Sequence, residues 1–138
     1  VHYGGSFNEV MGYPGDQLTT EYWFPWYDQL NMQTWVLVGN PNSTQDADVD
    51  IYIAGRLRGS YIIPPGGRVT PQFPGVMDGP VRVVSVNGVP IFVSQRVHYG
   101  GSFNEVMGYP GDQLTTEYWF PWYDQLNMQT WVLVGNPN

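Results

Sequence analysis

The chain has 138 residues, with twelve Asp or Glu against five Arg and a formal net charge of −7. Nucleic-acid binding needs a basic face that displaces counterions, so this excess of acid argues against such a partner. Cys is absent, which excludes disulfides and thiolate metal sites. Charged residues make up 12% of the chain, about half of the roughly 25% usual for soluble domains. We therefore expect something other than water to cover much of the surface.

An exact internal repeat is the strongest feature of the sequence. Residues 1–42 recur without change as residues 97–138, which defines a period of 96 residues. We interpret residues 1–42 as a partial repeat, residues 43–138 as one full period, and the whole as a window on a longer array. The period is longer than the about 20–50 residues of solenoid repeats and close to the roughly 100 residues of an immunoglobulin-like sandwich.

The first predicted strand contains five aromatic residues in the six positions that begin at Tyr22. Strand alternation puts Tyr22, Phe24 and Trp26 on one face, and Trp23 and Tyr27 on the other. Neither face is polar. We therefore expect one face to fill a core and the other to meet a second apolar partner.

Further strands follow from alternation and from turn residues. Residues 46–53 alternate between acidic or Tyr positions and apolar positions, as in a half-buried strand. Asn87 and Gly88 are typical of a type I′ turn, so we expect residues 81–86 and 89–93 to pair as a tight hairpin.

Seven strands are predicted in chain order, at residues 19–27, 33–39, 46–53, 57–63, 68–73, 81–86 and 89–93. Short strands at a spacing of about 8–12 residues are typical of sandwiches, and 17 Gly with 12 Pro argue against long helices. The predicted fold class is all-β, an immunoglobulin-like antiparallel β-sandwich.

Residues 100–112 are rich in Gly and Pro, and we expect them to form an irregular crossover between units. Because they also carry Phe, Val, Met and Tyr, we expect them to pack onto a domain surface. We further predict that residues 115–123 or 129–135 complete the sandwich begun by residues 43–96, by strand exchange between neighbouring units. The alternative is a string of separate domains.

Asp46, Asp48 and Asp50 resemble the start of a calcium-binding loop. The sixth position is Ile51 instead of Gly, and the twelfth is Leu57 instead of Glu. We therefore interpret the three residues as a solvated acidic strand face.

Residues for catalysis are not evident. His2 and its copy His98 have no second His or Cys within the period, and pairs such as Glu9 with Asp16 occur by chance in any acidic protein. No nucleophile elbow, phosphate-binding loop or zinc-protease motif is present. The sequence predicts no enzyme, no metal site and no cofactor. It also contains no apolar stretch long enough for a membrane helix.

Asn42, Ser43 and Thr44 match the N-glycosylation pattern and lie in a turn-rich stretch. Asn42 is therefore a candidate glycosylation site. The second copy ends at Asn138, where the pattern is incomplete.

Several segments together resemble tandem β-sandwich repeats of long secreted or surface proteins of bacteria. The segments that carry the likeness are residues 64–70, 79–83, 102–106, 118–124 and 130–137. The resemblance covers essentially the whole period. It implies an extracellular or cell-surface location and a structural or adhesive role, without catalytic residues.

Two functions remain open. The chain is either a structural repeat of an extracellular fibre or stalk, whose partner is itself, or a repeated glycan-binding module that uses the aromatic strand from Tyr22 to Tyr27. A fibre would bury Trp23 and Trp26 against a neighbour, whereas a lectin would leave them open. The candidate inter-repeat interface residues are Tyr22, Trp23, Phe24, Trp26, Tyr27, Trp35, Tyr118, Trp119, Phe120, Trp122, Tyr123 and Trp131.

Overall fold

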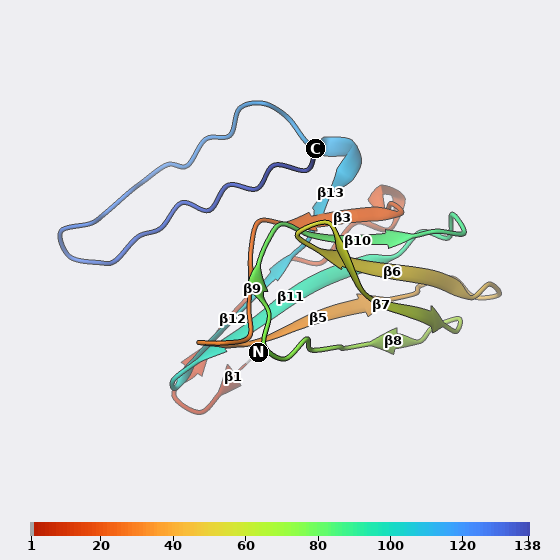
Figure 1. Cartoon of the computed structure of the whole chain (residues 1–138), viewed down its shortest axis with the longest axis horizontal. Helices are drawn as coiled ribbons and strands as arrows, with labels where there is room; N and C mark the ends of the chain where they lie inside the picture. Colours follow the sequence, from red (N-terminus) through yellow and green to blue (C-terminus); the bar gives the residue numbers. More distant parts are fainter. Residues whose placement is uncertain (1) are drawn as a thin grey trace.

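The computed structural model describes residues 2–138, and its strands form antiparallel sheets (Figure 1). The larger sheet has the order β13-β3-β10-β6-β7. Its strands are β3 (Glu21–Phe24), β6 (Ala47–Ile53), β7 (Arg56–Ile63), β10 (Val81–Ser85) and β13 (Tyr109–Pro110). The second sheet has the order β12-β11-β5-β8. Its strands are β5 (Gln33–Gly39), β8 (Arg68–Val69), β11 (Phe92–Tyr99) and β12 (Ser102–Met107).

Short elements complete the fold. Two small ladders pair β1 (His2–Tyr3) with β2 (Ser6–Phe7), and β4 (Tyr27–Asp28) with β9 (Met77–Asp78). Single 3₁₀ turns, η1 (Gly15–Gln17) and η2 (Gly111–Gln113), occupy the same position in the two copies. Residues 2–138 contain no helix that is long and apolar enough to span a membrane.

One hydrophobic core lies between the two sheets, as in a β-sandwich. Phe24 from β3, Ile51 from β6 and Val83 from β10 meet Val36 from β5 and Val93 from β11 in a single buried cluster. The alternation predicted for β6 is confirmed: its buried residues are Ala47, Val49, Ile51 and Ile53.

The hairpin predicted at Asn87 and Gly88 is wrong. β10 pairs with β3 and β6, whereas β11 pairs with β5 and β12. Gly88 has a φ of +81°, but Asn87 does not have the positive φ that a type I′ turn requires. Instead, the Asn87 amide donates to the Asp46 carbonyl at 2.9 Å and accepts from the Asp48 N–H at 3.2 Å. The turn therefore joins the two sheets and is held against β6.

The segment 100–112 packs on the domain as predicted, but much of it is regular strand instead of an irregular crossover. β12 pairs along β11, with Glu105 opposite Arg96, and β13 pairs with β3. The two strands extend both sheets of the sandwich. The signal was weak in the sequence because glycines interrupt the alternation on either side of β12.

The predicted ladder between residues 115–123 and residues 43–96 is also wrong for this structure. The first copy holds that place, since β3 pairs with β10 and Tyr22 lies opposite Val83. Residues 114–138 contain no strand and form an extended loop that reaches away from the sandwich (Figure 1). The folded unit therefore covers residues 15–110, which is one period of 96 residues.

Candidate inter-repeat junction

The copies meet at two places, and both involve residues that flank the folded unit. Residues 1–14 repeat the sequence of 97–110, and residues 111–138 repeat that of 15–42. We call residues 15–42 the first arm and residues 111–138 the second arm. The contacts of these flanking segments form the candidate functional site.

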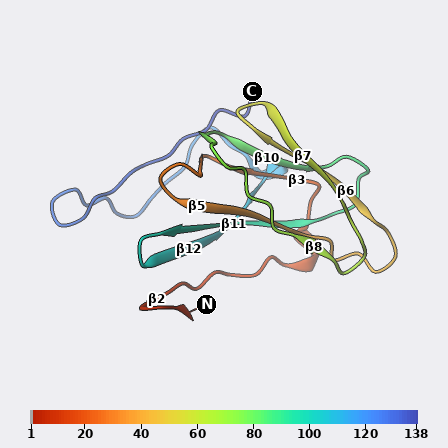
Figure 2. The same cartoon turned by 60° about the horizontal axis from the view of Figure 1, so that its bottom comes forward.

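The first junction places equivalent residues of the two copies side by side. β2 lies beside β12 (Figure 2), and Ser6 faces Ser102 with 3.5 Å between the hydroxyl oxygens. The Asn8 amide donates to Asn104 and accepts the backbone N–H of Glu105 at 3.2 Å. The open edge of β12 is thus partly satisfied by the first copy, which limits unwanted pairing at that edge.

Tyr13 fixes the other end of this junction. Its hydroxyl donates to the carbonyl of Gly108 at 3.1 Å, and its ring packs edge-on against Tyr22 with 5.6 Å between centroids. Burial, followed by the nearby Tyr22, Tyr109 and Asp112, raises the pKa of Tyr13 to about 12. Tyr109 packs in the same way against Tyr118, also at 5.6 Å. Both copies therefore contain the same contact between two Tyr rings.

The carboxylate of Glu105 ties β12 to β11. It accepts from Arg96 Nη2 at 2.6 Å, from Arg96 Nε at 3.0 Å and from the Ser94 hydroxyl at 2.8 Å. Its side chain is 11% exposed, so this ion pair is better shielded from water than an ordinary surface pair. The ion pair therefore fastens β12, the strand that β2 of the first copy contacts.

The second junction is an apolar groove of about 220 Å³ between the sandwich and the second arm. Trp23 and Pro80 line it on the sandwich side, and Phe120 and Val134 line it on the arm side. A Cβ on Gly135 would lie 3.0 Å from Pro80 Cβ and 3.3 Å from Pro25 Cα. Glycine is therefore what allows the arm to approach the sandwich this closely.

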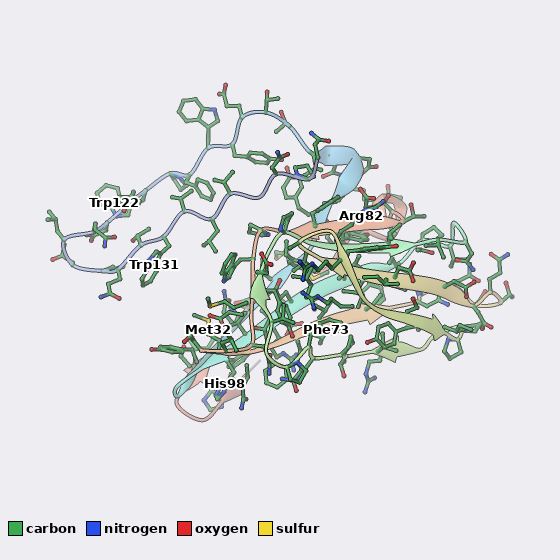
Figure 3. All side chains as sticks on the ribbon, viewed as in Figure 1. Met32, Phe73, Arg82, His98, Trp122 and Trp131 are labelled. Carbon is green, nitrogen blue, oxygen red and sulfur yellow. The ribbon has the colours of Figure 1, made fainter. Side chains whose placement is uncertain are left out.

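Identical residues have very different environments in the two arms. Phe24 is 3% exposed but Phe120 is 70% exposed, and Val38 is 1% exposed but Val134 is 87% exposed. Figure 3 shows Trp122 and Trp131 on the part of the second arm that lies away from the sandwich. The first arm is buried by the strands of residues 43–110, which the second arm does not contact as a sheet.

The structure places the aromatic residues of the first arm in three environments. Tyr22, Phe24 and Tyr27 lie in the core of their own sandwich. Trp23 is half-buried in the groove, with the Arg82 guanidinium 5.8 Å from its ring, and Trp26 is 39% exposed.

The predicted alternation fails after Phe24. β3 ends there and the chain bends at Pro25, so Tyr27 turns inward. Its hydroxyl donates to the Thr34 carbonyl at 3.0 Å and accepts the Phe73 N–H at 2.8 Å.

The remaining predicted residues lie outside the core. Trp35 borders a cavity of about 480 Å³ on the outer face of the second sheet, together with His2, Arg96 and His98. The second-arm residues Tyr118, Trp119, Phe120, Trp122, Tyr123 and Trp131 are all exposed. Of these, Tyr118 and Phe120 line the apolar groove.

Sequence reasoning missed the contacts of Asn8, Tyr13, Glu105 and Gly108. A usable signal was present, because these contacts join residues that are one period apart, give or take one position. Repeat proteins contact their nearest neighbours at such separations.

Other candidate chemistry is sparse. The described part of the chain holds no group of three or more His, Cys, Asp or Glu residues that could bind a metal, and the Asp50 carboxylate accepts from the hydroxyls of Tyr52 and Ser60. The Asn42 side chain accepts the N–H groups of Thr44 and Gln45, both at 2.9 Å, within the glycosylation pattern. No family model, curated protein or solved structure matches this chain.

Proposed function

We propose that this protein is a structural repeat of an extracellular fibre or surface stalk, in which immunoglobulin-like sandwiches stack on neighbouring copies. The observation that carries the proposal is the second junction. Leu114, four residues after Pro110, already lines this groove together with Trp23 and Pro80 of the folded unit. Its copy Leu18 lies outside the core of the folded unit, so a neighbouring unit can keep this contact when its own sandwich is formed.

The path of the chain supports stacking side by side. β13 runs antiparallel to β3, with Pro110 opposite Tyr22, so the chain arrives at and leaves from the same end of this strand pair. Gln17 and Gln113, which follow the two equivalent prolines, border one cavity. Successive units joined there would lie next to each other, which suits a compact array with nearest-neighbour contacts.

Composition and resemblance support the extracellular location. The chain is poor in charge and rich in aromatic residues, as expected where protein covers protein, and the sequence resembles repeats of secreted bacterial proteins. The glycan-binding alternative is less well supported, because the rings of Tyr22, Phe24 and Tyr27 are buried. This leaves only the half-buried Trp23 and the 39% exposed Trp26 of the aromatic strand for a sugar.

Electron microscopy of chains extended by whole 96-residue periods tests the proposal. We expect straight particles whose length grows by a constant step for each added period. Trp23→Ser in every unit should make the particles irregular while circular dichroism still reports folded sandwiches, because Trp23 lines the groove. Trp26→Ser is the matched control. Randomly kinked beads from the parent chain, or regular particles from the Trp23 variant, would contradict the proposal.

A further inference from the structure

We propose that residues 43–110 accept either arm, so that the second arm replaces the first within the same chain when the first no longer fits. The two arms are identical at all positions from 15–42 and 111–138. Every contact that the first arm makes with residues 43–110 is therefore available to the second in chemical terms. This inference is independent of the proposed fibre.

The second arm already has the local structure of the first. Asp28 accepts the N–H groups of Leu30 and Asn31, both at 2.8 Å. Asp124 accepts the equivalent N–H groups of Leu126 and Asn127, at 2.8 and 2.9 Å.

The other local bonds are repeated as well. Gln29 accepts the Thr34 N–H at 2.7 Å, and Gln125 accepts the Thr130 N–H at 2.8 Å. What the second arm lacks is the ladder with neighbouring strands and the burial of its apolar side chains in the core. It is preformed for the place that the first arm occupies.

The second arm also starts beside that place. Tyr109 and Pro110 pair with Trp23 and Tyr22 of β3, so the chain leaves residue 110 along the edge of the strand to be replaced. After replacement, Tyr118 would lie opposite Pro110, which closes a short antiparallel hairpin. The ring contact with Tyr109 already holds Tyr118 near this edge, and replacement would exchange that contact for burial in the place of Tyr22.

The second arm inserts into residues 43–110 of its own chain, not into those of a second copy. A tethered arm experiences an effective concentration of the order of millimolar, well above micromolar protein in solution. The first arm holds the place in this structure, and Tyr13 favours it through its hydrogen bond to Gly108 and its packing on Tyr22. Weakening the first arm should therefore shift the population to the second.

The matched pair Val38 and Val134 tests the inference, because the first is buried in β5 and the second is exposed. Val38→Asp would bury a carboxylate in the core if the first arm stayed in place. We expect this variant to remain folded and monomeric, with its second arm inserted. Val134→Asp should leave the first arm inserted and disturb only the apolar groove that Val134 lines, and the double variant should unfold because neither arm then fits.

Hydrogen exchange with mass spectrometry identifies the inserted arm, since the substitution gives the two otherwise identical copies different masses. In Val38→Asp, protection should move from residues 33–39 to residues 129–135. Protection that stays with the Asp-bearing copy, or is lost from both copies, would overturn the inference. Rescue that appears only with dimers in size-exclusion chromatography would overturn the intrachain route and assign the acceptor to a second chain.

Discussion

Tyr13 donates its hydroxyl proton to the carbonyl of Gly108 at 3.1 Å, across a sequence separation of 95 residues. Gly108 is the copy of Gly12, the residue that precedes Tyr13. The chain thus contacts its own repeat one period later. At this point the second copy runs against the core, because a Cβ on Gly108 would lie 2.9 Å from Tyr22 Cβ and 3.1 Å from Phe24 Cζ.

Gly108→Ala should therefore destabilise the sandwich. The added methyl group has no room beside two buried rings, and overpacking of this kind costs about 1–3 kcal/mol. Gly12→Ala is the control, since a Cβ there would meet nothing within 4 Å. Urea denaturation measures the stability of both variants. Equal midpoints would show that the close approach of Gly108 to Tyr22 and Phe24 is not important.

Glu105→Gln should lower the free energy of unfolding by about 1 kcal/mol, since it removes the charge that binds Arg96 in a half-buried setting. Glu9→Gln changes the same residue of the first copy, outside the β11–β12 ladder, and should have little effect. Thermal unfolding at low and high salt checks this. The difference between the variants should shrink at high salt, and a difference that grew with salt would contradict an ionic origin.

Ile51→Ala should cost about 2–5 kcal/mol, as expected for truncation of a fully buried side chain. Neither copy duplicates residues 43–96, so no second segment can compensate. Ile62→Ala on β7 is the control, because Ile62 is 72% exposed and should change stability by less than about 0.5 kcal/mol. Chemical denaturation decides, and comparable losses would argue against the assigned core.

Stability should fall in alkaline solution through Tyr13. Its pKa rises from 10.0 to about 12 in the fold, mainly because of burial, so the folded state favours the neutral phenol. The contribution of the neutral Tyr13 phenol to the free energy of unfolding is fully present below pH 10 and is lost as the pH rises toward 12. Tyr13→Phe should reduce the slope of stability against pH in this window. An unchanged slope would show that Tyr13 does not titrate as described.

The sequence was sufficient where local pattern and tertiary environment agree. The alternation in β6 predicted its buried face, because one side of that strand faces the core along its whole length. It was insufficient at Asn87 and Gly88, where a good turn sequence connects two sheets. A turn motif shows that the chain reverses, but not whether the flanking strands remain partners.

The arrangement of copies was beyond prediction for a different reason. Residues 19–27 and 115–123 have the same sequence, so no pattern could tell which of them pairs with β10. Packing decides this, and here it favours the copy that precedes residues 43–110. The importance of Tyr13 and Gly108 was hidden for the same reason, since their contacts exist only between copies.

The antiparallel pairing of β13 with β3 also determines how the unit would respond to tension. The chain enters β3 and leaves β13 at the same end of this strand pair. A pull on the two chain ends therefore acts perpendicular to the strands, instead of along them. The hydrogen bonds would then open one after another from that end, not together in shear. In single-molecule stretching we expect an early, low-force extension as β13 peels away, before the rest of the sandwich carries load.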